Sequence, residues 1–169
     1  MKKYKVKYDS AFVEAAVSRV AHEIGFQDGD VVLVVLDGGV WFSSQVLRFA
    51  KDVLLRVDFI KVSSYRRGIR GEVSLVCKAD LSGLEGRRVV VLDDICDSGN
   101  TLRYINGMLK GCGAKSVEFH TLIAREGYVL DEGMAFSSAI MDNSKDFFVG
   151  CGMDDNDGYG RNLDYIGVI

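Results

Sequence analysis

Two unbroken apolar runs constrain the fold of this chain more than any other feature of its sequence. They are VVLVVL at residues 31–36 and the VVVL inside RVVVLD at residues 88–93. A strand without alternation between apolar and polar residues must be buried on both faces, as strands are in a parallel sheet covered by helices. The segments LLRVDFIKV (54–62) and SVEFHTLI (116–123) are two further predicted strands.

Helical patterns separate these strands. From Ser10, apolar residues recur at helical spacing as far as Ile24, and Gly25 is a plausible end. Residues 41–50 form the next predicted helix, and a third begins near Thr101. Repeated strand, helix, strand units predict an α/β fold with a central, mostly parallel twisted sheet, right-handed crossovers and helices on both faces.

Two segments, at residues 65–78 and 126–145, fit this alternation poorly. The first is charged and punctuated by Gly, so it is predicted to be a long flexible loop or a hairpin beside the site, because long loops in compact domains are usually functional or disordered. The sequence contains no Pro, internal repeat or linker. Residues 1–169 are therefore expected to form a single domain.

The charge distribution argues against a nucleic-acid-binding surface. The formal net charge is -3, and Lys and Arg are scattered apart from one group at Arg66, Arg67 and Arg70. A protein that binds nucleic acid through its surface usually presents a basic field. We therefore expect a small-molecule pocket and no nucleic-acid partner.

The cysteines and the lengths of the apolar segments bear on location. Cys77, Cys96, Cys112 and Cys151 form no CxxC pair, which argues against a zinc site or a redox motif. Reduced thiols of a cytoplasmic protein are the simpler interpretation. No apolar segment approaches the length of a bilayer span. A cytoplasmic location without a membrane partner is expected.

Ligand-binding chemistry is concentrated in the stretch VVVLDDICDSGNTL. Asp93 and Asp94 come at the carboxyl end of a predicted strand, where parallel sheets bind ligands. Ser98 and Thr101 lead into a predicted helix, whose N-terminal N–H groups favour a phosphate. Carboxylates repel a phosphate, so we expect the acidic pair to face a ribose diol and magnesium, while Asp97 handles a proton.

The same stretch closely resembles the phosphoribosyl-pyrophosphate binding motif of type I phosphoribosyltransferases. That motif is an apolar strand, two acidic residues, two further residues, Asp, a small hydroxyl residue, Gly, any residue and Thr. An isolated acidic pair at a strand end is more often a helix cap on the surface, but the strand before it and the hydroxyl residues after it favour the binding motif. Residues 31–48, 57–65 and 146–169 resemble further segments of the hypoxanthine-guanine branch of this family.

The resemblance implies the type I phosphoribosyltransferase fold, with a small hood formed by the terminal segments. Residues 146–169 would be the base-binding segment of the hood, and residues 65–78 a mobile catalytic loop. In this branch the loop after the first strand contains a non-proline cis peptide bond, which would lie at or next to Leu36 and Asp37. An oligomer, either homodimer or homotetramer, is also implied, and the helix at 41–50 is a candidate contact surface.

Site residues follow from the resemblance position by position. The predicted catalytic residues are Asp97, Ser64 and Tyr65. The residues expected to bind the phosphoribosyl group and its phosphate are Asp93, Asp94, Asp97, Ser98, Gly99, Asn100 and Thr101. The residues expected to bind pyrophosphate are Leu36, Asp37, Gly38, Gly39 and Arg161. The residues expected to bind the base are Ile95, Arg125, Phe147, Phe148 and Asp154. The residues expected to bind magnesium are Asp93, Asp94 and Asp154.

Three departures from the branch pattern lie in these segments. Arg125 stands where the branch usually has a Lys aimed at the exocyclic oxygen of the purine, and Arg has a wider fork and a different reach. Asp37 places a negative charge in the pyrophosphate loop, unless its side chain points away or meets magnesium. The segment before Arg161 is one residue longer than the pattern.

The implied activity is purine salvage, in which phosphoribosyl pyrophosphate and a 6-oxopurine, hypoxanthine or guanine, give a nucleoside monophosphate and pyrophosphate. Magnesium is the implied cofactor. Two alternatives stay open. One is a phosphoribosyltransferase for xanthine or another base, and the other is a regulatory protein on the same fold that senses phosphoribosyl pyrophosphate.

Overall fold

The computed structural model describes residues 4–66, 69–77 and 80–169, and within them six strands form one sheet in the order β4-β3-β2-β5-β6-β7. All neighbouring pairs run parallel except β3 and β4. The strands are β2 (Val31–Leu36), β3 (Arg56–Arg66), β4 (Ile69–Cys77), β5 (Arg88–Cys96), β6 (Ser116–Ala124) and β7 (Ala135–Met141). The predicted mostly parallel sheet is confirmed.

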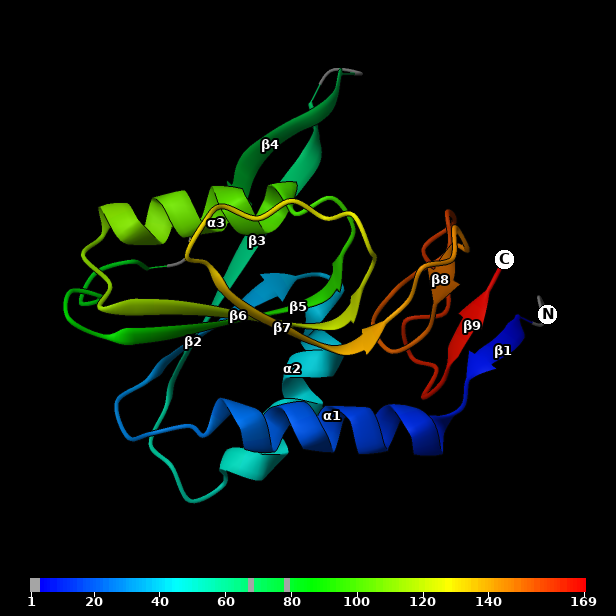
Figure 1. The fold of residues 1–169 in the computed structure, drawn as a ribbon, viewed down its shortest axis with the longest axis horizontal. Coiled ribbons are helices and arrows are strands. Elements are labelled where there is room, and N and C mark those ends of the chain that lie inside the picture. Colours follow the sequence, from blue (N-terminus) through cyan, green and yellow to red (C-terminus); the bar gives the residue numbers. More distant parts are fainter. Residues whose placement is uncertain (1–3, 67–68, 78–79) are drawn as a thin grey trace.

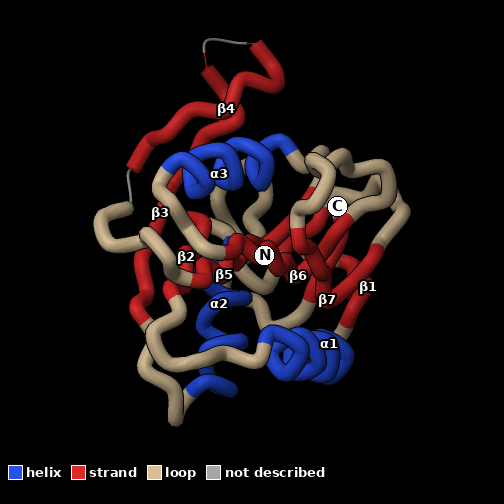
Figure 2. Tube along the Cα trace, turned by 60° about the vertical axis from the view of Figure 1, so that its left-hand side comes forward, coloured by secondary structure: helices blue, strands red, loops and turns tan. Residues whose placement is uncertain are grey.

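Helices cover both faces of this sheet. Helix α1 (Ser10–Ile24) and helix α2 (Gly39–Leu47), which continues into the short 3-10 helix η1 (Arg48–Ala50), lie on one face, and α3 (Asn100–Gly111) lies on the other (Figures 1 and 2). Gly25 ends α1 with a φ of 55°, a left-handed conformation that glycine adopts without steric cost. None of the described helices is long and apolar enough to cross a membrane.

The unbroken apolar runs are explained by two cores. Successive side chains of a strand point to opposite faces, and in β2 Val32 and Val34 join the core under α1 and α2, whereas Leu33 joins the core under α3. The same division holds for β5, where Val90 faces α1 and α2 and Val91 faces α3. Each run is continuous because both faces of its strand pack in a core.

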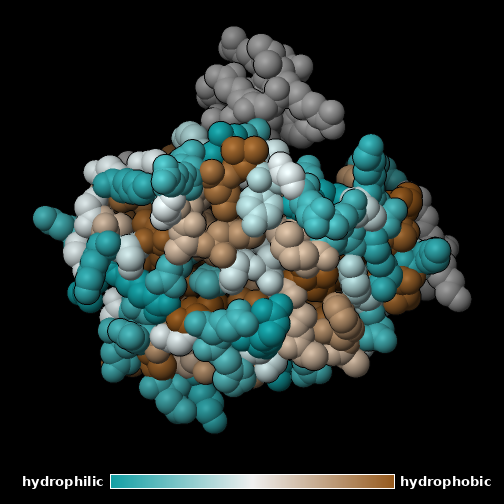
Figure 3. Space-filling model, in the orientation of Figure 1, coloured by the Kyte–Doolittle hydropathy of each residue, from teal (hydrophilic) through white to brown (hydrophobic). Residues whose placement is uncertain are grey.

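A second, three-stranded sheet joins the two ends of the chain. Its order is β1-β9-β8, with β1 (Lys5–Tyr8) antiparallel to β9 (Ile166–Val168) and β9 antiparallel to β8 (Phe148–Val149). Figure 1 shows it beside the carboxyl ends of the central strands. On the face seen in Figure 3, apolar and hydrophilic side chains are interspersed. The implied hood of terminal segments is confirmed.

Two segments differ from the simplest sequence interpretation. Within 126–145, where no element was predicted, β7 pairs with β6 in parallel without an intervening helix. The sequence AFSSAIM hides this strand because it is an edge strand, polar at Ser137 and Ser138. The segment 65–78 takes the hairpin form, built by β3 and β4. Residues 67–68 and 78 lie outside the described residues, and the mobility of this segment stays a prediction.

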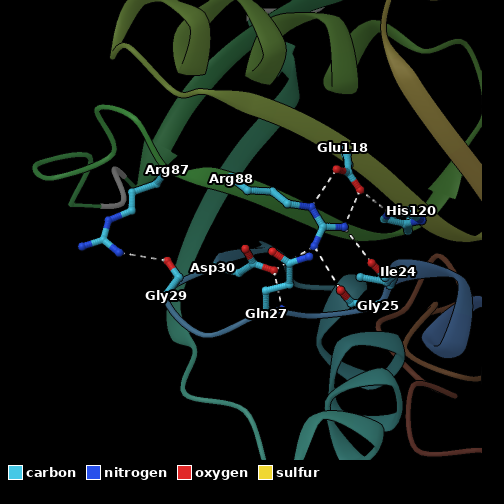
Figure 4. Close-up of polar contacts among 9 residues, drawn as sticks. All are labelled: Ile24, Gly25, Gln27, Gly29, Asp30, Arg87, Arg88, Glu118 and His120. Carbon is cyan, nitrogen blue, oxygen red and sulfur yellow. Dashed lines mark hydrogen bonds and ion pairs between the residues drawn. The ribbon is translucent and has the colours of Figure 1, made fainter.

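A polar cluster ties the end of α1 to the amino ends of β5 and β6 (Figure 4). The guanidinium of Arg88 lies 2.8 Å from an Asp30 carboxylate oxygen and 2.7 Å from Glu118, and it also donates to the Ile24 carbonyl oxygen at 2.7 Å. His120 lies beside this cluster, with Nε2 3.9 Å from a Glu118 oxygen. These contacts hold the end of α1 against the amino ends of two interior strands of the sheet.

The buried imidazole of His120 predicts a pH dependence of stability. Burial lowers the pKa of His120 below 6.5, with the Arg88 charge adding to this effect and the Glu118 and Glu23 charges opposing it. The unfolded chain therefore takes up this proton first as pH falls below about 6.5, so the free energy of unfolding decreases until pH passes below the folded pKa. Urea unfolding at pH 7.5 and 5.5 should show a larger loss for the wild type than for His120→Gln. Equal losses would contradict this prediction.

Candidate active site

The candidate site lies where two neighbouring parallel strands end. Val34 of β2 pairs with Leu92 of β5, so the residues that follow leave the sheet side by side. They border a cavity of about 350 Å³. The cavity is lined by Val35, Leu36, Asp37, Gly38, Val62, Asp93, Asp94, Ile95, Asp97, Ser98, Gly99, Asn100, Thr101, Asp154 and Arg161. Most of the predicted phosphoribosyl and pyrophosphate residues are therefore brought together.

The acidic pair Asp93 and Asp94 is part of the cavity lining. The Asp94 N–H donates to Asp93 Oδ1 at 2.9 Å, and the Ile95 N–H donates to Asp94 Oδ1 at 2.9 Å. Burial raises the pKa of both carboxyls, and the negative charge of Asp94 raises that of Asp93 further. Two neighbouring carboxyls of this kind favour a ligand that brings hydroxyl donors or a cation.

The loop after β2 packs directly on the acidic pair. The peptide bond between Leu36 and Asp37 is cis, as the family resemblance implies. A Cβ at Gly38 would lie 1.7 Å from Asp94 Oδ2, and one at Gly39 would lie 3.1 Å from the Asp93 Cα. Glycine at these positions thus allows the loop to touch β5 and leaves its backbone open to a ligand.

Lys61 of β3 neutralises the unexpected charge of Asp37. Its Nζ lies 2.5 Å from Asp37 Oδ2, and Lys61 pairs with Leu36 in the parallel register of β2 and β3. This partner was not predicted from the sequence. Aligning the two predicted strands by their carboxyl ends would have placed Lys61 beside the loop.

The loop from Asp97 to Thr101 leads into α3, which begins at Asn100. Gly99 precedes the helix with a φ of 81° and provides no side-chain cap. Ser98 Oγ accepts a hydrogen bond of 3.4 Å from the Asn100 N–H. A helix N-terminus without a side-chain cap, beside two hydroxyl residues on a cavity wall, is suited to an anion such as a phosphate.

Arg161 reaches the cavity despite the extra residue before it. It lies 2.7 Å from an Asp154 carboxylate oxygen, and it donates to the Gly152 carbonyl oxygen at 2.6 Å. Burial raises the pKa of Asp94, and the positive charge of Arg161 opposes this rise. The placement agrees with a pyrophosphate contact, which stays a prediction.

The residues predicted to bind the base lie partly inside and partly outside the described lining of the cavity. Ile95 and Asp154 line the cavity, whereas Arg125, Phe147 and Phe148 do not belong to its described lining. Phe147 is 45% exposed, and Phe148 is buried. Stacking of Phe147 on a purine and hydrogen bonding by the Phe148 backbone stay predictions.

Asp97 forms an ion pair with Arg125, and its predicted role in proton transfer stays a prediction. Arg125 Nε lies 2.9 Å from Asp97 Oδ1. The other edge of the guanidinium donates to the main-chain carbonyl oxygens of Ser144 and Asp146. A linear motif does not indicate this pair, because Asp97 and Arg125 follow different strands, β5 and β6, whose parallel pairing places their carboxyl ends together.

Ser64 and Tyr65 lie on β3, and their side chains are outside the part of the chain that is described. Their predicted role in closing over the transition state stays a prediction. The backbone of β3 runs from the cavity wall at Val62 into the hairpin, so both residues follow the site directly in sequence.

The acidic residues could hold magnesium only together with oxygen atoms of a ligand. Among the described residues, no three His, Cys, Asp or Glu side chains are placed to hold a metal ion, and Asp154 is paired with Arg161. Magnesium usually binds one or two carboxylates plus substrate phosphates and water. The adjacent carboxyls of Asp93 and Asp94 fit that arrangement.

Comparison with known proteins agrees with this geometry. The phosphoribosyl transferase domain family matches residues 8–156. The hypoxanthine-guanine phosphoribosyltransferase of Lactococcus lactis is 36% identical over 142 residues, which are 82% of this chain and 74% of that protein. The protein of the same name from Streptococcus agalactiae is 38% identical over 138 residues, 80% of this chain and 74% of that one.

Solved structures show the same architecture. A hypoxanthine-guanine phosphoribosyltransferase from Bacillus anthracis superposes with a TM-score of 0.84 at 28% identity, covering 100% of this chain and 99% of that one. A hypoxanthine phosphoribosyltransferase from Staphylococcus aureus gives a TM-score of 0.83 at 25% identity, covering 98% and 90%.

Proposed function

This chain belongs to the phosphoribosyltransferase family, and from that membership we propose that it transfers the 5-phosphoribosyl group of phosphoribosyl pyrophosphate to a 6-oxopurine, hypoxanthine or guanine. The products are the nucleoside monophosphate and pyrophosphate. The observation that carries the proposal is the cavity in which the acidic pair, the 97–101 loop and the loop after β2 converge.

The phosphoribosyl end of the substrate is assigned to the 97–101 loop. Its 5-phosphate accepts hydrogen bonds from the backbone N–H groups at the start of α3 and from the hydroxyls of Ser98 and Thr101. The ribose hydroxyls donate to Asp93 and Asp94, which lie on the same cavity wall. The phosphate and the carboxylates thereby face different parts of one ligand.

The leaving pyrophosphate is assigned to the loop after β2 and to Arg161. Gly38 and Gly39 let the backbone approach it, and the Arg161 guanidinium supplies a positive charge on the cavity wall. Magnesium, when bound at Asp93 and Asp94 with substrate oxygens, supplies charge neutralisation for the pyrophosphate. Asp154 orients Arg161 through their 2.7 Å ion pair.

The reaction forms a bond between a purine ring nitrogen and the anomeric carbon of ribose. The bond from that carbon to the pyrophosphate oxygen breaks, and the oxygen keeps the electron pair. Positive charge develops on the sugar, as in glycoside chemistry, and the nearby carboxylates favour it. Asp97 accepts the proton of the attacking nitrogen. Ser64 and Tyr65 are proposed to exclude water when the hairpin closes.

A pyrophosphate-release assay tests the proposal. The wild-type protein is incubated with magnesium and phosphoribosyl pyrophosphate, and hypoxanthine, guanine, xanthine, adenine, uracil or orotate is offered separately. Release that depends on hypoxanthine or guanine is expected. Release with xanthine or a pyrimidine alone would favour a phosphoribosyltransferase for another base. Binding of phosphoribosyl pyrophosphate without any release would favour a regulatory protein that senses this ligand.

The protein is also proposed to form a homodimer or homotetramer and to act in the cytoplasm. The helix pair α2 and η1 offers the exposed apolar side chains of Val40 and Phe49 for a subunit contact. The thiols of Cys96, Cys112 and Cys151 are free, which agrees with a reducing compartment. Light scattering during gel filtration should give two or four times the mass of the 18.6 kDa chain, and a monomer would contradict the oligomer.

A further inference from the structure

Arg125 lies between the 97–101 loop and the segment that leads to β8. It comes directly after β6, and its backbone N–H donates to the Cys96 carbonyl oxygen at 3.0 Å. This bond anchors the main chain of Arg125 beside the residue that precedes Asp97. The side chain then places Nε 2.9 Å from Asp97 Oδ1.

The rest of the guanidinium faces the segment that leads to β8. Nη1 donates to the Ser144 carbonyl oxygen and Nη2 to the Asp146 carbonyl oxygen, the latter at 2.6 Å. The guanidinium carbon lies 4.7 Å from the centre of the Phe148 ring, within the range of a cation–π contact. One planar group therefore joins Asp97 to the residues on either side of Phe147.

Side chains of β1 hold the segment 142–146 in place. Lys7 of β1 lies 2.9 Å from an Asp142 oxygen and 2.7 Å from an Asp146 oxygen, and it donates to Ser144 Oγ at 2.6 Å. Tyr8 donates to Asp142 at 2.6 Å. Because the hood holds this segment, the contacts of Arg125 connect Asp97 to a fixed partner.

Asp97 needs such a partner, since its side chain is 72% exposed. An exposed carboxylate has several rotamers, and a proton acceptor is effective only within hydrogen-bond reach of its donor. A lysine ammonium is a compact charge on a flexible stem and lacks the planar fork that meets one carboxylate and two carbonyl groups in fixed directions.

We propose that Arg125 is a positioning residue that holds the Asp97 carboxylate in a fixed position relative to the base-binding segment. This inference rests on the proposed function, in which Asp97 accepts the proton of the base. It differs from the role that the resemblance implies, a direct contact with the exocyclic oxygen of the purine. Arg125 acts through Asp97, so its contribution requires the carboxylate to be present.

A double-mutant cycle tests this dependence. The variants are Arg125→Lys, Arg125→Gln, Asp97→Asn and each Arg125 change combined with Asp97→Asn, and the readout is nucleotide formation in a single turnover at saturating substrates. Each Arg125 change alone should slow this step by about 10²-fold, a typical cost of misplacing a reacting group. In the Asp97→Asn background the same change should cost less than about threefold, because coupled residues are not additive.

Other readouts separate positioning from direct base binding. The KM for hypoxanthine should change by less than about twofold if Arg125 acts through Asp97, whereas loss of a direct contact with the base would raise it. Arg19→Lys is the matched control, because Arg19 also donates to a main-chain carbonyl oxygen, that of Ala139 at 2.8 Å, away from the site. Thermal unfolding of each variant checks that it folds, and Arg125→Gln serves if Arg125→Lys does not fold.

Three outcomes decide the matter. A large loss with Asp97 present and a small loss without it supports the positioning role. Equal losses in both backgrounds, or full activity of Arg125→Lys, would overturn it and leave the proposed function intact. No turnover of any base by the wild type would instead contradict the proposed function, and the role of Arg125 in this reaction with it.

Discussion

Replacing Asp97 with Asn is expected to slow single-turnover nucleotide formation by about 10²–10⁴-fold, the usual contribution of a positioned acid or base. An amide keeps the size of the side chain but cannot take the proton of the attacking nitrogen. It also loses the charge that pairs with Arg125 at 2.9 Å. The Kd for phosphoribosyl pyrophosphate, measured by calorimetry with magnesium, should stay within about threefold of the wild-type value. A threefold change in Kd corresponds to less free energy than a typical hydrogen bond contributes.

Asp131→Asn is the control for this change, because Asp131 is exposed and lies outside the described lining of the cavity. It should leave both the rate and the binding unchanged. A rate for Asp97→Asn that matches the wild type would show that another group, or water, removes the proton. A parallel loss of phosphoribosyl pyrophosphate binding would move Asp97 from proton transfer to substrate binding.

Replacing Gly38 with Ala is expected to weaken binding of magnesium and phosphoribosyl pyrophosphate by about 10²-fold or more, in line with the cost of displacing a site group by about an ångström. The new Cβ would lie 1.7 Å from Asp94 Oδ2, so either the carboxylate or the loop must move. Both carry proposed contacts with the substrate, and the carboxylate is held by the Ile95 N–H at 2.9 Å. Calorimetric titration of the variant measures the loss directly.

Gly107→Ala is the matched control for Gly38→Ala. Gly107 lies within α3, and a Cβ there meets nothing within 4 Å. It should bind the substrate as the wild type does and unfold at an equal or higher temperature, because alanine favours a helix over glycine. Unchanged binding by Gly38→Ala would mean that Asp94 does not contact the ligand in the arrangement proposed.

The fold was predictable from the sequence because its central strands are buried on both faces. The unbroken apolar runs VVLVVL and RVVVLD reveal this burial in the sequence itself. The helix that starts at Ser10 ends at Gly25, as its pattern of apolar residues indicates. Strand β7 was missed because an edge strand is only partly covered and can include the polar pair Ser137 and Ser138. A strand of this kind lacks the periodic or continuous apolar signal on which such predictions depend.

The site was predictable where one contiguous stretch carries the chemistry, as from Asp93 to Thr101. Pairs to which two strands each contribute one residue were missed, because they require the alignment of the strands as well as the motif. The pair of Lys61 with Asp37 depends on the register of β2 and β3, and the pair of Arg125 with Asp97 depends on that of β5 and β6. Side-chain partners across a sheet follow from strand pairing, which a linear motif does not encode.

A competition experiment among purine bases tests whether the protein makes 6-oxopurine nucleotides. Equal concentrations of hypoxanthine, guanine, xanthine and adenine are mixed with magnesium, limiting phosphoribosyl pyrophosphate and the wild-type protein, and the nucleotides formed are identified by mass spectrometry. From the proposed function, we expect the monophosphates of hypoxanthine or guanine to make up most of the product. A product that is mainly the adenine or xanthine nucleotide, or no nucleotide at all, would contradict it.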